Sequence, residues 1–135
     1  MTGCLGILPA KAQANCADRH IQDKEDLELA SIMIKAIATP GHTDSHMAYL
    51  VNEERVLTGD ALFIRGCGRT DFQDGDAGTL YDSVTIRLFT LPDSTLVYPA
   101  HDYKGQTVST IGAEKSENPR FAGRDRANFI QFMNN

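Results

Sequence analysis

Three short segments place metal-binding side chains directly after apolar runs that read as strands. The side chains are those of His42, Asp60 and His101. Because a sheet holds the backbone at a strand end, ligands there project into a cleft from a rigid base. Gly41 and Gly59 precede the first two ligands and allow sharp turns. Two imidazoles and a carboxylate suit Fe(II), Zn²⁺ or Mn²⁺, and two histidines with one carboxylate is the arrangement of non-haem iron oxygenases.

Each of these residues also has an ordinary structural explanation. His42 or Asp60 could cap a turn or a helix, and His101 could be a hydrogen-bonded core histidine. The similar local settings of the three favour a shared site over three separate structural roles.

Five short apolar segments predict the strands that must position these ligands. Residues 27–37 carry apolar, often β-branched residues at spacings of two or three, which predicts two strands joined by a turn at Ala30-Ser31. Residues 47–51 and 55–58 flank a polar turn and predict a hairpin, and residues 95–98 predict a buried strand. The long glycine-rich stretch from Gly59 to Gly78 predicts a functional loop.

Two helices complete the predicted α/β domain. Leu80, Val84, Leu88 and Leu91 recur at helical spacing, and Pro92 ends that helix. The second helix is predicted from about Arg124, with an apolar side made of Ala127, Phe129 and Ile130. Residues 3–17 predict an irregular or helical segment.

Composition bounds the function classes. The 135 residues fit one domain, 1–135, and the net charge of −5 with a pI of about 5.2 argues against nucleic acid as a partner. Neither a signal peptide nor an apolar run of membrane-spanning length occurs in the sequence. The three cysteines form no C-x-x-C pair, which predicts a reducing, cytoplasmic setting without membrane attachment. The late arginine cluster is typical of a solvated helix face.

Several rare strings resemble one protein family. Residues 38–44 (ATPGHTD) and 57–62 (LTGDAL) resemble metal motifs of the metallo-β-lactamase superfamily. Residues 63–73 (FIRGCGRTDFQ) resemble the persulfide dioxygenase branch of that superfamily, near glyoxalase II. The same branch is indicated by YPAHDY, TVSTIG and NPR, at residues 98–103, 107–112 and 118–120. The strings occur in the family's order, so the likeness covers roughly residues 20 to 135.

The resemblance implies an Fe(II) enzyme that converts glutathione persulfide and O₂ to sulfite and glutathione. Its iron is bound by a histidine of an early H-x-H-x-D-H motif and by the residues that match His42 and Asp60. The residue matching His101 belongs to a second metal position of the superfamily. In the iron enzymes it usually lies next to the metal ligands and does not bind the iron itself. Zn²⁺ is the alternative metal.

The resemblance also implies a substrate pocket. Tyr103 matches a catalytic position, and Arg65, Cys67 and Arg69 match substrate-binding positions. A guanidinium suits the anionic carboxylates of glutathione and a developing sulfinate. The two arginines could equally be solvated or paired with Asp71, and Cys67 could be inert.

One part of the family pattern is absent from this sequence. None of the four histidines lies in an H-x-H-x-D-H string, and residues 1–3 (MTG) resemble those that follow that motif. The resemblance therefore predicts the C-terminal half of a metallo-β-lactamase αββα sandwich, with weak or no activity. His20 or His46 could replace the missing ligand only if the fold brought it there.

Half of a sandwich leaves one apolar sheet face exposed. Because the family's two halves are related by a pseudo-two-fold axis, a homodimer could imitate the missing half through an isologous interface. Two alternatives stay open: a non-catalytic dimeric module that retains the metal loops as structure, and a zinc hydrolase of the glyoxalase II kind.

Overall fold

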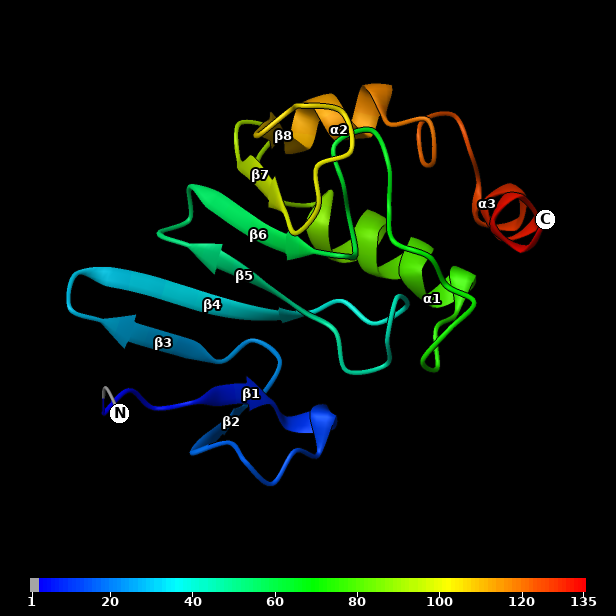
Figure 1. Cartoon of the computed structure of the whole chain (residues 1–135). Coiled ribbons are helices and arrows are strands. Elements are labelled where there is room, and N and C mark those ends of the chain that lie inside the picture. Colours follow the sequence, from blue (N-terminus) through cyan, green and yellow to red (C-terminus); the bar gives the residue numbers. More distant parts are fainter. Residues whose placement is uncertain (1–2) are drawn as a thin grey trace.

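A six-stranded mixed sheet forms the centre of the protein in the computed structural model, which describes residues 3–135 (Figure 1). The strands lie in the order β3-β4-β5-β6-β7-β8. β6 and β7 pair in parallel, and the other neighbours pair antiparallel. The strand bounds are β3 Asp26–Leu29, β4 Ile32–Ala38, β5 Met47–Val51, β6 Arg55–Gly59, β7 Leu96–Pro99 and β8 Ser109–Thr110.

The two predicted hairpins are confirmed. Ala30 has a φ of 55° in the turn between β3 and β4, and Asn52 and Glu53 have φ values of 50° and 56° between β5 and β6. The two consecutive left-handed residues between β5 and β6 match the right-handed twist of paired strands, so they make the tight turn that this hairpin needs. The predicted strand at 95–98 is confirmed as β7.

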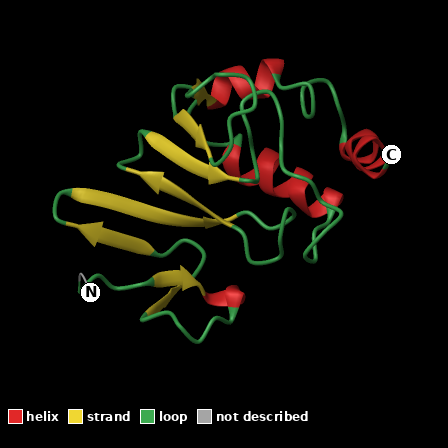
Figure 2. Cartoon of the chain, viewed as in Figure 1, coloured by secondary structure: helices red, strands yellow, loops and turns green. Residues whose placement is uncertain are grey.

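Helices cover one face of the sheet (Figure 2). α1 (Ala77–Asp82) runs into a π-helical segment, η2 (Ser83–Leu88), and the two bury Leu80, Val84 and Leu88 against strand residues such as Val56. The predicted helix is therefore present but ends at Leu88, and Leu91 lies beyond it. The carboxylate of Asp76 accepts a hydrogen bond from Thr79 N at 2.7 Å, which satisfies a free amide at the start of α1.

Two further helices close this layer. α2 (Ile111–Glu117) was not predicted because it has only seven residues and no apolar periodicity. α3 (Arg126–Asn134) confirms the predicted C-terminal helix, with Phe129 fully buried and stacked on Phe121 at 4.9 Å between ring centroids. The prediction for Ala127 was wrong, because that side chain is exposed on the outer side of α3.

The opposite face of the sheet carries a row of side chains that pair across four strands. Ala36 is opposite Tyr49, Tyr49 opposite Leu57, and Leu57 opposite Tyr98. Leu57 is 44% exposed and the two tyrosines are half-buried, whereas Ala36 at the β4 end of the row is fully buried. We call this set the Leu57 row; as predicted, an apolar sheet face remains partly uncovered.

The N-terminal segment forms a small separate layer beside β3. β1 (Ile7–Pro9) and β2 (Arg19–Ile21) pair in parallel, with a 3₁₀ turn, η1 (Ala10–Ala12), between them (Figure 1). The prediction of an irregular or helical segment here was wrong in part, since the register with Arg19–Ile21 makes residues 7–9 a strand. No helix among residues 3–135 is long and apolar enough to cross a membrane.

The burial of Phe129 leads to a stability prediction. Phe129→Ala should lower the free energy of unfolding by about 3–5 kcal/mol, because it removes a fully buried ring that joins α3 to the core. Phe132→Ala is the matched control: this ring is on the same helix but is 40% exposed, and its loss should cost about 1 kcal/mol or less. Urea unfolding followed by circular dichroism measures both; equal losses would contradict the assigned packing.

Candidate metal centre

Three strands that run in the same direction bring the predicted ligands to one edge of the sheet. β4 and β6 are both antiparallel to β5, and β7 is parallel to β6, so all three end at the same edge. His42, Asp60 and His101 follow these ends within a few residues. The predicted placement of all three directly after strands agrees with the structure.

The imidazole of His42 is oriented by a backbone carbonyl. Its Nδ1–H donates to Arg69 O at 2.8 Å, which fixes the tautomer of the neutral ring and leaves the Nε2 lone pair free. Nε2 faces the carboxylate of Asp60, with 3.5 Å between Nε2 and Oδ2. Gly68 allows this approach, because a Cβ there would lie 2.9 Å from His42 Nδ1 and 2.2 Å from Asp60 O.

Asp60 is held by a second histidine, which sequence reasoning considered only as a substitute ligand. Asp60 N donates to His46 Nε2 at 3.1 Å, and His46 Nδ1 lies 2.8 Å from Thr39 Oγ1. Burial, and to a lesser extent the neighbouring His42, lower the pKa of His46, which favours its neutral form. Both ring nitrogens are therefore engaged, so His46 ties Asp60 to the end of β4 and is not available to a metal. His20 lies on β2 and contacts Ala14 O instead.

His101 contacts the other oxygen of the same carboxylate. Its Nδ1 lies 2.5 Å from Asp60 Oδ1, and its ring is stacked on Tyr103 at 5.8 Å and lies edge-on to Phe63 at 5.8 Å. Tyr103 is 76% exposed at the mouth of this aromatic group.

The residues present fit part of a metal site. The His42 Nε2 and Asp60 Oδ2 atoms face one another at a separation compatible with both binding one ion at about 2 Å each. Yet among residues 3–135 no three His, Cys, Asp or Glu side chains are arranged so that they could hold a metal ion. The described chain thus offers two ligands, with His101 hydrogen-bonded behind one of them.

A pocket of about 260 Å³ lies beside this carboxylate–histidine group. It brings together Arg65, Cys67, Tyr103 and His101, four of the residues that the sequence singled out. Lys104, Arg120 and the carboxylate of Asp102 also line it, so cationic side chains outnumber anionic ones in the pocket. Arg120 is the arginine of the NPR string and belongs to the late arginine cluster, which the sequence predicts to be a solvated helix face. The fold instead places Arg120 in the lining of this pocket.

The two predicted substrate-binding arginines lie in different surroundings. Arg65 donates from its guanidinium to Glu114 and to Glu117, both at 2.5 Å, so its charge is already paired. Arg69 pairs with Asp71 through two hydrogen bonds of 2.7 and 3.0 Å and lines an adjoining pocket of about 340 Å³. The ion pair considered for both arginines with Asp71 is therefore present for Arg69 and absent for Arg65.

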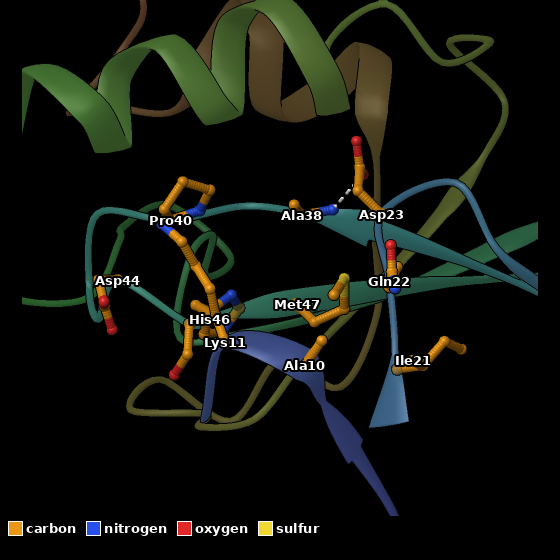
Figure 3. Close-up of a pocket in the computed structure, with 11 residues that line it drawn as sticks. Ala10, Lys11, Ile21, Gln22, Asp23, Ala38, Pro40, Asp44, His46 and Met47 are labelled. Atoms are coloured by element: carbon orange, nitrogen blue, oxygen red, sulfur yellow. Dashed lines mark hydrogen bonds between the residues drawn. The ribbon is translucent and has the colours of Figure 1, made fainter. Parts of the chain in front are cut away.

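Another cavity, of about 290 Å³, lies between the N-terminal layer and the loop from β4 to β5 (Figure 3). Ile21, Ala38 and Met47 give it a mostly apolar wall. Asp23 also lines it, and Oδ1 of its carboxylate accepts from Ala38 N at 2.7 Å and pairs with Arg87. His46 reaches it from the metal side. None of the predicted metal or substrate residues lines this cavity.

The comparisons with known proteins agree with this geometry. Residues 17–101 match the model of the metallo-beta-lactamase superfamily, and the chain belongs to that superfamily. Within it, the chain is similar to the mitochondrial persulfide dioxygenase ETHE1 of Bos taurus (46% identical over 89% of this chain and 47% of the relative) and of Homo sapiens (43% over 100% and 53%). A hydroxyacylglutathione hydrolase of Dictyostelium discoideum is 35% identical over 74% of this chain and 39% of its own length.

A solved structure shows the same fold. The crystal structure of ETHE1 from Myxococcus xanthus superposes with a TM-score of 0.91 at 50% identity, over 96% of this chain and 56% of that one. The chain thus spans about half the length of the relatives it matches. The predicted resemblance and the predicted half of a metallo-β-lactamase sandwich are confirmed.

The surroundings of Cys67 lead to a reactivity prediction. Its thiol contacts Met133 Sδ at 4.0 Å, and burial raises its pKa to about 12. At pH 8 only about one molecule in 10,000 would carry the thiolate, which is the reactive form. Brief treatment of the native protein with iodoacetamide should therefore alkylate the exposed Cys4 and Cys16 only, as read by peptide mass spectrometry. All three should react in urea; equal labelling of Cys67 in the native protein would contradict its burial.

Proposed function

We propose that this chain carries the C-terminal part of a persulfide dioxygenase site for one Fe(II) ion and glutathione persulfide. The orientation of His42 carries the proposal: its Nδ1–H is fixed on Arg69 O, so that the free Nε2 faces the Asp60 carboxylate. When bound, the iron would supply oxygen activation. The higher identity to persulfide dioxygenases than to hydroxyacylglutathione hydrolases favours sulfur oxidation over zinc-dependent hydrolysis.

The basic pocket supports an anionic thiol as substrate. Arg120 has no carboxylate partner within ion-pair distance among residues 3–135, and it lies in the pocket with Lys104 and Tyr103. Free cations there suit the carboxylates of glutathione. Tyr103 stays our candidate for the catalytic group, and Arg65, Cys67 and Arg69 stay candidates for substrate contact, with Arg65 limited by its two glutamate partners.

Two ligands bind a metal weakly, because each coordinating side chain supplies a large share of the affinity. We therefore propose that the 135-residue chain alone has weak or no dioxygenase activity. A non-catalytic module of this fold is the alternative. A cytoplasmic setting also remains a proposal, while the animal relatives are named as mitochondrial.

We further propose that a second copy of the chain covers the Leu57 row. Three neighbouring strands, β5, β6 and β7, present the partly exposed Tyr49, Leu57 and Tyr98 in register, and the chain aligns with only about half of each relative. A self-complementary contact of this kind is isologous.

Metal content tests the proposed function. Protein purified without chelators should contain iron or zinc at less than one ion per chain. His42→Ala should lose this metal, whereas His20→Ala, which changes the β2 histidine that contacts Ala14 O, should keep it. Elemental analysis measures all three proteins, and oxygen uptake with glutathione persulfide follows for the iron-loaded form. No metal in the unaltered chain would refute the catalytic proposal; about one iron per chain would mean that a third ligand is recruited.

Solution mass tests the dimer. Analytical ultracentrifugation should give twice the chain mass of 14.8 kDa. Leu57→Glu should shift the protein to the monomer, because it places a charge in the contact. Ile86→Glu is the matched control, since Ile86 is 63% exposed on η2, in the helical layer on the other face of the sheet. A protein that stays monomeric at high concentration would contradict the proposal.

A further inference from the structure

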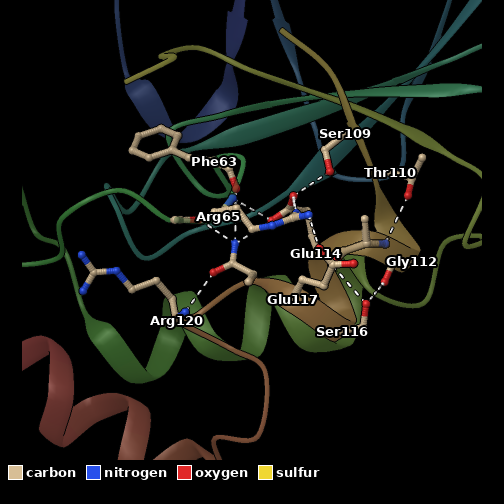
Figure 4. A network of polar contacts seen from close by, with 12 residues as sticks. Phe63, Arg65, Ser109, Thr110, Gly112, Glu114, Ser116, Glu117 and Arg120 are labelled. Carbon is tan, nitrogen blue, oxygen red and sulfur yellow. Dashed lines mark hydrogen bonds and ion pairs between the residues drawn. The ribbon is translucent and has the colours of Figure 1, made fainter. Parts of the chain in front are cut away.

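A buried carboxylate on α2 holds the loop that carries the metal-site residues (Figure 4). Glu114 is fully buried, and each of its oxygens accepts two hydrogen bonds. Oε2 accepts from Arg65 N at 2.9 Å and Asn118 Nδ2 at 2.8 Å, and Oε1 accepts from Arg65 Nη1 at 2.5 Å and Ser109 Oγ at 2.6 Å. A buried charge is costly unless it is paired and hydrogen-bonded, and this one is fully satisfied.

The backbone that is hydrogen-bonded to Glu114, at Arg65, has an unfavourable conformation. Arg65 has a φ of 60°, in the left-handed region that residues with a side chain seldom adopt. It lies in a tight turn closed by Phe63 N to Gly66 O at 2.9 Å and Gly66 N to Phe63 O at 3.3 Å. Asn118 Nδ2, whose two N–H groups are shared with Glu114 Oε2, lies 3.3 and 3.0 Å from these two carbonyl oxygens. Glu114 and Asn118 thus fix the turn at its tip and at its base.

The turn is directly connected to both proposed ligands. The turn begins three residues after Asp60. After the turn the loop comes back to Asp60, where Gly68 N donates to Asp60 O at 2.9 Å. The next residue, Arg69, supplies the carbonyl that orients His42. A shift of the turn would therefore move the backbone beside Asp60 and Arg69 O, the hydrogen-bond partner of His42 Nδ1 among residues 3–135.

We propose that Glu114 is a positioning residue for the metal site, acting through the Phe63–Gly66 turn on the orientation of His42 and the placement of Asp60. Arg65 then serves mainly as the cation that neutralises this carboxylate. The inference rests on the proposed metal site, but it concerns how the metal-free chain arranges the two ligands. Replacing a residue that supports a metal ligand without binding the metal typically lowers metal affinity by about 10–100-fold.

Glu114→Gln is the decisive variant. The glutamine side chain has the shape of glutamate but only one acceptor oxygen, whereas the donors around Glu114 are bonded to two. Some of these donors lose their partner in the variant, so the turn should loosen. In metal-free protein at alkaline pH, nitrogen-15 NMR of the imidazole should show His42 as the Nδ1–H tautomer in the unaltered chain and as a mixture in the variant. The affinity for cobalt(II), measured by equilibrium dialysis, should fall at least about tenfold.

Two controls separate positioning from general loss of stability. Glu117→Gln removes the outer partner of Arg65 on the same helix. Glu117 is 61% exposed and pairs with the guanidinium of Arg65, not with the backbone of the turn, so both measurements should stay unchanged. Phe129→Ala should be less stable yet keep the His42 tautomer under conditions where it remains folded.

The outcomes are distinguishable. A folded Glu114→Gln protein with the unaltered tautomer and unaltered cobalt affinity would overturn the inference. If that variant does not fold, Glu114→Asp decides by the same criteria, because it keeps the charge opposite Arg65 but shortens the reach to the turn. If the unaltered chain binds no cobalt, the proposed function fails, while the ring tautomer still decides whether Glu114 orients His42.

Discussion

The shared direction of β4, β6 and β7 is the constraint on which the candidate site depends. Backbone hydrogen bonds fix this direction, and they place three strand ends at one edge of the sheet. His42, Asp60 and His101 are 18 and 41 residues apart in sequence, yet their side chains meet around a single carboxylate. The loops beyond the strands add the fine orientation, because Arg69 O and His46 direct the His42 ring and the Asp60 backbone. The sheet thus sets which residues meet, and the loops set which atoms face one another.

The buried ion pair explains why the glycine-rich loop keeps one shape. Seven residues separate Asp60 from Gly68, and such a segment would sample many conformations if only its ends were held. Glu114 and Asn118 remove that freedom by accepting from and donating to the backbone of the turn. A buried carboxylate contributes little net stability, since desolvation offsets much of the attraction to Arg65. Its effect is on specificity: the carboxylate selects one arrangement of the loop, and that arrangement presents a carbonyl to His42.

The sequence predicts those parts of the structure that depend on local pattern. The hairpin turns at Ala30 and Asn52, the strand at Leu96 and the ligand positions after strand ends all follow from periodicity and turn chemistry within about ten residues. The partners of Arg65 could not be predicted, because Glu114 is 49 residues away and α2 has no apolar pattern. The β1–β2 pair was missed for a related reason: a parallel pair is defined by the register between residues that lie far apart in the sequence. Local chemistry thus identified the candidate ligands, whereas their supports required the fold.

The uncovered sheet face and the incomplete ligand set are connected through one strand. β6 carries Leu57 in the exposed row and ends one residue before Asp60. Three residues of chain span at most about 10 Å, so Leu57 lies no farther than that from the proposed ligand. A partner that covers the row therefore comes close to the proposed metal site. A second copy that covers the row can bring its own side chains to the edge of the sheet where His42 and Asp60 lie, and one of them can serve as a third ligand. In that case metal occupancy rises with dimerisation and falls when Leu57→Glu breaks the contact. Metal occupancy independent of that substitution would show that the second copy does not complete the metal site.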